Sequence, residues 1–358
     1  TLFVPLIAIT ILITLIIVKT GIIGFIGTIS LLFVIALIYI ILKKPKAGIL
    51  LLIILGFFVT GIARYIPAPW GLSIDGLLVL IYIALFFKGF ANKIPWRNAK
   101  SPLTLVATIW MGYVSLQIVN PETQSIEAWF YAMRGLALYQ WLVIPLLFMI
   151  FNKSKDLNNF FIIWGVLSLI GTLKGLMQFK FGVDPFEQRW LDQGGAETHV
   201  LFGKLRVFSF YSDAGQFGAS QGHSGVVFGI LALLKKNNLK LKTFFLIVAL
   251  AGFFGMLISG TRGAIAVPAL GGITFLILQK NIKILILGGI LGIAVYVFFA
   301  HTTIGQGNAE IRRMRTAFDP NEASLQVRLA NQNKLKGYLA SRPFGGGVGA
   351  TGNWGQRF

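Results

Sequence analysis

The sequence predicts an all-α fold, a polytopic bundle of helices that crosses a membrane many times. Of its 358 residues, 56% are hydrophobic and only 12% are charged, whereas soluble domains are about 45–50% apolar and about 25% charged. The mean hydropathy is +0.77, and apolar runs of the roughly 20 residues that span a bilayer recur along the chain. This composition argues against a soluble enzyme, a disordered chain or a nucleic-acid-binding domain, despite the net charge of +20.

Eleven apolar runs are candidate transmembrane helices. They cover roughly residues 2–18, 21–42, 47–64, 71–88, 102–119, 127–151, 157–180, 213–234, 243–259, 263–279 and 283–300. Very short links within 2–42 and within 243–279 predict helical hairpins. The first run is short and begins at the start of the sequence, so we expect the natural chain to begin upstream of it.

The short connections that are rich in basic residues all fall on one side when the runs alternate. One set of connections carries a net charge of +14 and the alternate set +6. The basic set contains Lys43, Lys44, Lys46, Lys88, Lys93, Arg97, Lys100, Lys153, Lys155, Lys235, Lys236, Lys240, Lys242, Lys280 and Lys283, together with Asp156. Solvation of helix ends alone does not explain this alternation. Because short loops rich in Lys and Arg stay in the cytoplasm, the pattern predicts a cytoplasmic N-terminal side.

Two connections on the opposite, outer side are too long to be turns. We therefore predict a transmembrane bundle over 1–300, with an outer loop at about 181–212, followed by a large outer loop over 301–358. Within the second loop, 309–318 and 322–341 have the spacing of amphipathic helices, which we expect on the outer membrane surface. An odd number of spans leaves the last residue outside, so we expect the chain to continue beyond it.

The composition also limits the chemistry. The chain has no cysteine and 3 histidines, which leaves no disulfide framework, thiolate metal site or cysteine nucleophile. The histidines are not clustered, so we expect neither a metal nor another cofactor.

Apart from the lysines that flank the inner ends of the spans, the ionisable residues in or beside the spans all fall in the outer half of the predicted bundle. They are Arg64, Asp75, Arg134, Lys174, Asp213, His223 and Arg262. A charge within a bilayer is costly, so such residues are functional candidates. A channel or proton relay would place polar groups through the full depth of the membrane, whereas a site open only outward would collect them on one side, as here.

Several of these residues have structural explanations as well. Arg134 lies about two turns inside its helix, where it lines a cavity, pairs with Glu127 or extends to the interface. Asp213 and His223 bound a very polar stretch that either lines a wet cavity or satisfies its own hydrogen bonds. We expect Lys174 to extend to the interface, and Arg64 and Asp75 could pair at the rim.

Arg262 lies in a predicted turn, 259–263, that also offers hydroxyl groups and the N–H groups of a helix start. Helix N-termini and guanidinium groups both favour phosphate, although one arginine at a hairpin could equally anchor to lipid headgroups. The late loop is basic, which favours an anionic ligand or anionic headgroups. Its glycine-rich stretch at 341–352 lacks the features of a dinucleotide loop or a P-loop and is interpreted as a bend.

Three stretches in this order are similar to the O-antigen ligase and O-antigen polymerase superfamily. Arg206 opens RVFSFYSDAGQFG, Arg262 lies in SGTRGA, and Arg328 precedes LASRPFGGGVG. The resemblance covers the chain from about residue 120 onward. The earlier helices are similar to the family only in being apolar and of spanning length.

The resemblance implies a metal-independent membrane glycosyltransferase of the polyprenyl-phosphate-sugar type in the bacterial inner membrane. Such enzymes take a glycan from an undecaprenyl-diphosphate donor at the periplasmic face and pass it to a lipid, a polysaccharide or a protein. It also implies that Arg206, Arg262 and Arg328 hold the diphosphate. The histidine that activates the acceptor in the ligases follows the GVG stretch and would lie beyond Phe358, so no catalytic residue is assigned.

Two other functions share these sequence features. A flippase or exporter of lipid-linked anionic saccharides would use similar arginines, but internal repeats and a path through the inner half are expected for it, and neither is seen. A non-catalytic subunit of a membrane complex is the third possibility. The sequence does not separate ligase, polymerase and protein-glycosylating activity, nor does it name the sugar.

Overall fold

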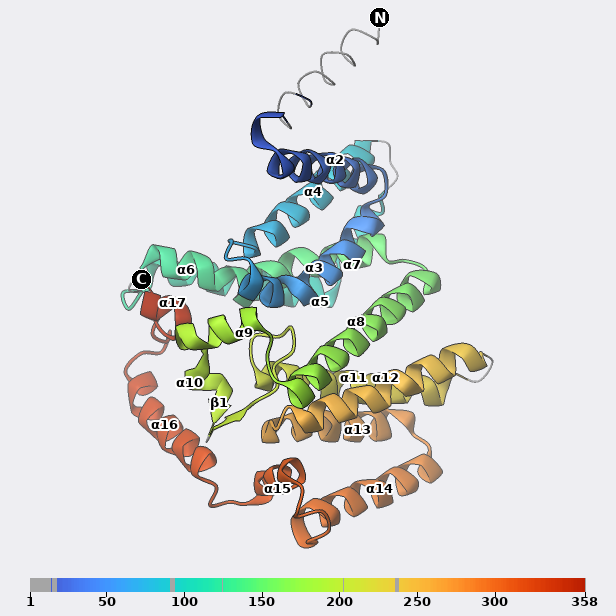
Figure 1. Cartoon of the computed structure of the whole chain (residues 1–358), viewed down its shortest axis with the longest axis vertical. Helices are drawn as coiled ribbons and strands as arrows, with labels where there is room; N and C mark the ends of the chain where they lie inside the picture. Colours follow the sequence, from blue (N-terminus) through green and yellow to red (C-terminus); the bar gives the residue numbers. More distant parts are fainter. Residues whose placement is uncertain are drawn as a thin grey trace, which may run out of the picture.

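The computed structural model describes residues 14, 18–90, 94–123, 125–201, 203–235 and 238–357. This part of the chain is almost entirely helical (Figure 1). Two short strands, β1 (Val200–Leu201) and β2 (Lys204–Leu205), pair antiparallel, with Val200 opposite Leu205. In the described residues, 9 helices are long and apolar enough to cross a membrane. The protein is therefore a helical, multi-pass membrane protein.

The spanning helices agree with the predicted runs, apart from their ends. They are α2 (Ile22–Lys43), α3 (Pro45–Tyr65), α4 (Gly71–Phe90), α5 with its terminal turn (Pro102–Val119), α6 to α7 (Ile126–Ile150), α8 (Ser154–Phe181), α11 (Ala214–Leu234), α12 (Leu239–Ile258) and the segment Arg262–Gln279, whose main part is α13 (Ala266–Gln279). A further apolar helix, α14 (Ile282–His301), follows. The predicted run at 2–18 lies almost wholly outside the described residues.

Local sequence determines where several of these helices begin. The side chains of Ser101, Ser125, Asp213 and Asn238 each accept a hydrogen bond from a backbone N–H in the first turn of the following helix. Such caps satisfy donors that have no partner within the helix. Pro45 starts α3 directly after Lys44, the one residue that separates it from α2.

The helix ends define two sides of the bundle. On one side, the lysine side, Lys88 donates to the backbone oxygen of Lys43 (2.6 Å) and Lys46 pairs with Asp156 (2.6 Å). The connections from α2 to α3, from α7 to α8 and from α13 to α14 lie toward this edge, at the right of Figure 1. The opposite side, the loop side, carries the two long connections. The alternation of basic connections along the sequence therefore corresponds to one face of the fold.

Helix packing relies on two apolar clusters and on small residues. Ile49, Ile81 and Leu146 are buried where α2, α3, α4 and α7 meet, and Phe228 and Phe245 are buried between α11 and α12. Glycines bring α11 and α12 together: a Cβ on Gly252 would lie 2.7 Å from the backbone oxygen of Gln221. Close approach of backbones is how helices associate where lipid is as apolar as the side chains.

The loop side carries short helices from both long connections. They are α9 (Pro185–Trp190), α10 (Ala196–His199), α15 (Ala309–Arg315), α16 (Ala323–Ala340) and α17 (Gly352–Arg357). The two predicted loop helices correspond to α15 and α16, which are separated around Asp319-Pro320-Asn321. Their contact with a membrane surface stays a prediction, because α16 exposes its side chains from 325 to 340 all around.

Candidate anion-binding site

Arg206 and Arg262 meet at the turn between α12 and α13. Arg206 follows β2, and its Nη2 donates to the hydroxyl of Thr261 (3.1 Å). That hydroxyl in turn donates to the backbone oxygen of Ala214 at the start of α11 (2.8 Å). Thr261 is the residue directly before Arg262. Both arginines are half-buried, and the contact with Thr261 brings the side chain of Arg206 to the turn that carries Arg262.

The turn itself has little freedom. Gly260 has a φ of +59°, a conformation that favours glycine. The buried hydroxyl of Ser259 accepts from the N–H of Thr261 (3.1 Å) and donates to the oxygen of Met256 (2.7 Å). These contacts fix Thr261, which accepts a hydrogen bond from Arg206, and the backbone that carries Arg262.

A third arginine, Arg313 of α15, completes the site. A Cβ on Gly260 would lie 3.4 Å from Cδ of Arg313, so this side chain covers the turn. Burial, and then the charges of Arg206 and Arg262, lower the pKa of Arg313. Burial also lowers the pKa of Arg206, where the charge of Arg262 adds to the effect and Asp213 opposes it. Arg206, Arg262 and Arg313, hereafter the arginine cluster, are thus close enough to repel one another.

Two carboxylates accompany the cluster. Glu322 pairs with Arg262 (2.5 Å), which also donates to the hydroxyl of Thr316 (3.0 Å). Asp213 caps α11 and accepts from Ser212 Oγ (2.8 Å). Burial would raise the pKa of Asp213, but hydrogen bonds from the backbone of Gln216 and from Ser212 hold it below its usual value. Three guanidinium groups against two carboxylates leave an excess of positive charge.

His199, which was not among the predicted site residues, lies next to the cluster. Its backbone oxygen accepts from the N–H of Arg206 (2.8 Å), and its ring Nε2 lies 3.1 Å from the oxygen of Ser212. The ring is buried, and its Nδ1 lies 2.9 Å from the oxygen of Gly195. Both ring nitrogens therefore bind the loop, and the residue holds Arg206 and Ser212 in place. The sequence feature that could have identified His199 is its position in the first long loop, just before Arg206.

Arg64 has a different role from the rim pair with Asp75 that the sequence suggested. Its guanidinium donates to the backbone oxygens of Ser209 (2.7 Å) and Tyr211, and it lies 4.3 Å from the centroid of the Phe208 ring. Arg64 thereby ties the loop that carries Arg206 to the end of α3, and its donors serve the protein rather than a ligand.

Lys174 forms an ion-pair network at the loop-side end of α8 instead of extending alone to the interface. It pairs with Asp184 (2.8 Å) and with the buried Glu187 (3.1 Å). Gln178 donates to Glu187 (2.9 Å) and accepts from the N–H of Ser209 (2.8 Å). Burial opposes ionisation of Asp184, but hydrogen bonds from Lys174 and Tyr65 lower its pKa to about 2. This network fixes the first long loop on the bundle.

Arg134 pairs across the bundle and not with Glu127. It is buried, lies in a π-helical turn (Arg134–Leu138), and binds Asp75 of α4 and the hydroxyl of Tyr139. Glu127 instead accepts from Ser125 Oγ (2.8 Å). The pair with Glu127, one of three alternatives that the sequence left open for Arg134, is therefore not formed, and in the described residues no contact joins Arg134 to the arginine cluster.

His223 and Arg328 lie away from the cluster's contacts. His223 is exposed beside the Trp164 ring, with centroids 5.1 Å apart, and lies roughly 15 Å along α11 from Asp213 at the usual helical rise. Arg328 is exposed on α16, without a hydrogen bond or ion pair among the described residues. Of the residues predicted to hold an anion, Arg206 and Arg262 come together, and Arg313 stands where Arg328 was expected.

The glycine-rich stretch docks on the loop-side end of α5. The backbone oxygen of Phe344 accepts from Gln117 (3.1 Å) and Tyr113 (3.2 Å), and Arg342 pairs with Glu122 (3.0 Å). Gly349 has a φ of +86°, and a Cβ there would lie 2.6 Å from the backbone of Ala128. The stretch is thus a bend, as predicted, whose glycines also allow backbone contact.

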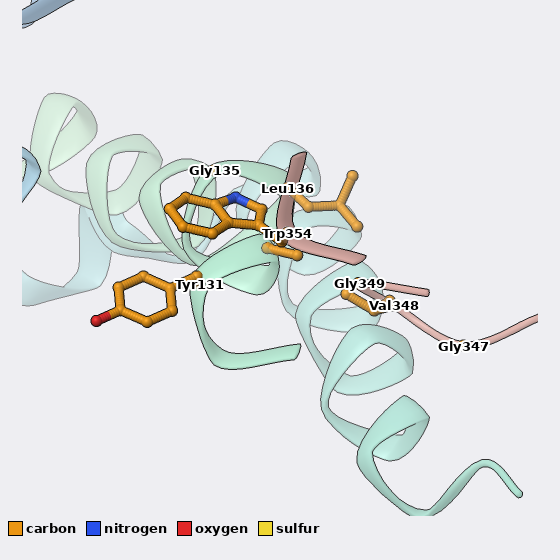
Figure 2. A pocket seen from close by; sticks show the side chains of 8 residues that line it. Tyr131, Gly135, Leu136, Gly347, Val348, Gly349 and Trp354 are labelled. Carbon is orange, nitrogen blue, oxygen red and sulfur yellow. The ribbon is translucent and has the colours of Figure 1, made fainter. Parts of the chain in front are cut away.

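A shallow, largely apolar cavity of about 520 Å³ lies beside this stretch (Figure 2). Leu136 and Val348 line it, together with the stacked rings of Tyr131 and Trp354, whose centroids are 4.7 Å apart. Its walls bear no ionised side chain, so the candidate anion site remains the arginine cluster.

Comparisons of this chain with protein-family models, with curated proteins and with solved structures find no match. The class that the fold and the site define is a multi-pass helical membrane protein with an arginine cluster at one end of its bundle.

Proposed function

We propose that this protein is a membrane glycosyltransferase of the polyprenyl-phosphate-sugar type. It would transfer a glycan from an undecaprenyl-diphosphate-linked donor to a lipid, polysaccharide or protein acceptor at the periplasmic face of the bacterial inner membrane. The observation that carries this proposal is the convergence of Arg206, Arg262 and Arg313 around the Thr261 turn. The order of the three sequence stretches supports it independently.

The chemistry of such a transfer suits the arginine cluster. Breaking the bond between sugar and diphosphate develops negative charge on the leaving group. Guanidinium groups that are already held in place stabilise this charge without a further reorganisation, and their planar forks match phosphate oxygens. Thr261, Ser259 and Arg64 serve this purpose indirectly, because they fix the turn and the loop from which the arginines project.

The orientation follows from the distribution of basic residues. The lysine side would face the cytoplasm under the positive-inside rule, which places the loop side and the arginine cluster in the periplasm. A lipid-linked donor would then approach from the outer leaflet, with its diphosphate at the depth of the loop that carries Arg206 and the turn that carries Arg262.

The test is a charge-removing substitution at the turn. We expect Arg262→Ala to leave the protein inserted but to slow glycan transfer by roughly 10²–10³-fold, as for removal of an oxyanion-hole donor. Arg262→Lys should rescue poorly, because an ammonium group lacks the bidentate fork. Lys240→Ala, an exposed change on the lysine side, is the control.

The assay measures surface polysaccharide and donor lipid in the same cells. Full transfer activity in Arg262→Ala would show that Arg262 only anchors the turn to lipid headgroups, and it would refute the proposal. Accumulation of donor lipid on the cytoplasmic face would favour an exporter instead.

A further inference from the structure

In the part of the chain that the structure describes, the ion pairs and hydrogen bonds that join helix α16 to the rest of the protein lie at or just beyond its two ends. At its start, Glu322 pairs with Arg262 of the arginine cluster (2.5 Å). Beyond its end, Arg342 pairs with Glu122 (3.0 Å) and Phe344 is bound by α5. The side chains from 325 to 340 are all exposed. The position of α16 therefore depends on its end contacts, one of which involves a candidate ligand-binding residue.

Glu322 joins the helix to the cluster through its two carboxylate oxygens. Oε1 pairs with Nη1 of Arg262, while Oε2 accepts from the N–H of Leu325 (2.9 Å) and so caps α16. The Glu322 side chain is only 16% exposed and that of Arg262 27%, so water screens this pair incompletely. Movement of the Glu322 carboxylate would consequently disturb the hydrogen bond that caps the first turn of α16.

A phosphate group and Glu322 can compete for Nη1 of Arg262. Nη1 of Arg262 is engaged by both Glu322 and the hydroxyl of Thr316 (3.0 Å). A phosphate that binds the guanidinium end-on, through both Nη groups, must replace at least one of these partners, because Nη1 has only two N–H donors. The carboxylate is the partner that a phosphate repels, since both are anionic, whereas the Thr316 hydroxyl can remain.

We propose that Glu322 is an internal competitor for the anionic ligand of the arginine cluster, and that ligand binding displaces it and releases the start of α16. This inference rests on the proposed function, because it assumes that the cluster binds a phosphate-containing ligand. In the ligand-free protein Glu322 offsets part of the positive charge and holds α16 at the cluster. In the ligand-bound protein α16 is retained by its other end, at Glu122 and α5.

The first measurement uses inorganic pyrophosphate and the purified full chain in zwitterionic detergent. Glu322→Gln removes the competing charge but keeps an amide oxygen that can cap α16 at Leu325. We expect pyrophosphate to bind this variant roughly three- to tenfold more tightly, which corresponds to loss of one partly exposed ion pair. Glu310→Gln, which changes the charge equally on α15, should alter the affinity less than about twofold, since long-range effects between exposed charges are screened.

The second measurement follows α16 directly. Because the chain has no cysteine, spin labels can be attached at Asn331→Cys on α16 and Lys240→Cys on α12 without background. We expect pyrophosphate to shift the distance distribution between these labels, and Glu322→Gln to produce a similar shift without ligand.

The outcomes separate the two proposals. Pyrophosphate binding that requires Arg262 but is unchanged in affinity and label distance by Glu322→Gln would overturn the inference and leave the anion site intact. Failure of pyrophosphate to bind the wild-type protein at all would overturn the anion site itself, and the inference with it.

Discussion

Arg206 donates a hydrogen bond to Thr261, a residue 55 positions later in the chain, at 3.1 Å. Thr261 immediately precedes Arg262, so this contact brings the guanidinium group of the first long loop and that of the turn between α12 and α13 together. The Thr261 hydroxyl is itself oriented by the hydrogen bond that it donates to the backbone oxygen of Ala214 (2.8 Å). The site is therefore built on the ends of three helices, α11, α12 and α13, whose packing is fixed by glycine contacts deeper in the bundle.

The third member of the cluster provides the first prediction. Arg313→Ala should weaken pyrophosphate binding by roughly tenfold or more, because hydrogen bonds from a charged donor contribute about 1.5–3 kcal/mol. Arg312→Ala, at the neighbouring exposed position, should change binding less than about twofold. Calorimetric titration measures the pyrophosphate affinity of both variants. Equal losses of affinity would show that binding depends only on the overall charge of α15.

Orientation is tested with single cysteines in the otherwise cysteine-free chain. Gly307 suits the loop side, since a Cβ there meets no atom within 4 Å, and Lys240 suits the lysine side because it is exposed. An impermeant thiol reagent added to intact spheroplasts should label Gly307→Cys and spare Lys240→Cys. The reverse pattern would invert the proposed topology and place the arginine cluster in the cytoplasm.

The pair of Asp75 and Arg134 should stabilise the packing of α4 against the π-helical turn between α6 and α7. Removal of either charge leaves the other without its partner inside the bundle, which is costly. We expect Asp75→Leu and Arg134→Leu each to lower the unfolding temperature in detergent. The double variant should lose about 1–3 kcal/mol less than the sum of the single changes, as interacting neighbours do. Strict additivity in the double-mutant cycle would contradict a direct pair.

Two glycines of the docking stretch make a matched comparison. Gly345 and Gly349 have φ angles of +80° and +86°, so alanine at either position carries a left-handed strain of about 1–2 kcal/mol. At Gly345 a Cβ meets open space, whereas at Gly349 it would lie 2.6 Å from the backbone of Ala128. Hydrogen exchange of amides 344–350 should therefore rise strongly in Gly349→Ala and slightly in Gly345→Ala. Equal exchange in the two variants would mean that the contact with Ala128 does not hold the stretch.

The sequence by itself determined the spans and their alternation. Length and apolarity are properties of a local segment, because each helix must satisfy its own backbone hydrogen bonds in lipid. Nine of the predicted runs accordingly reappear as helices of spanning length in the described residues. Charge position is equally local, and the basic connections do collect on one side of the bundle.

Only the tertiary structure decided which polar residues meet. Spacing along one helix suggested Glu127 as the partner of Arg134, yet Asp75 reaches it from another helix. Sequence similarity suggested Arg328 as the third cationic residue, yet Arg313 covers the turn at Gly260. Arg64, which appeared to be a rim charge, serves the backbone of the loop at Ser209. The physical reason is that charged groups pair with whatever helix packing brings within hydrogen-bonding distance, and that packing depends on contacts between segments far apart in the chain.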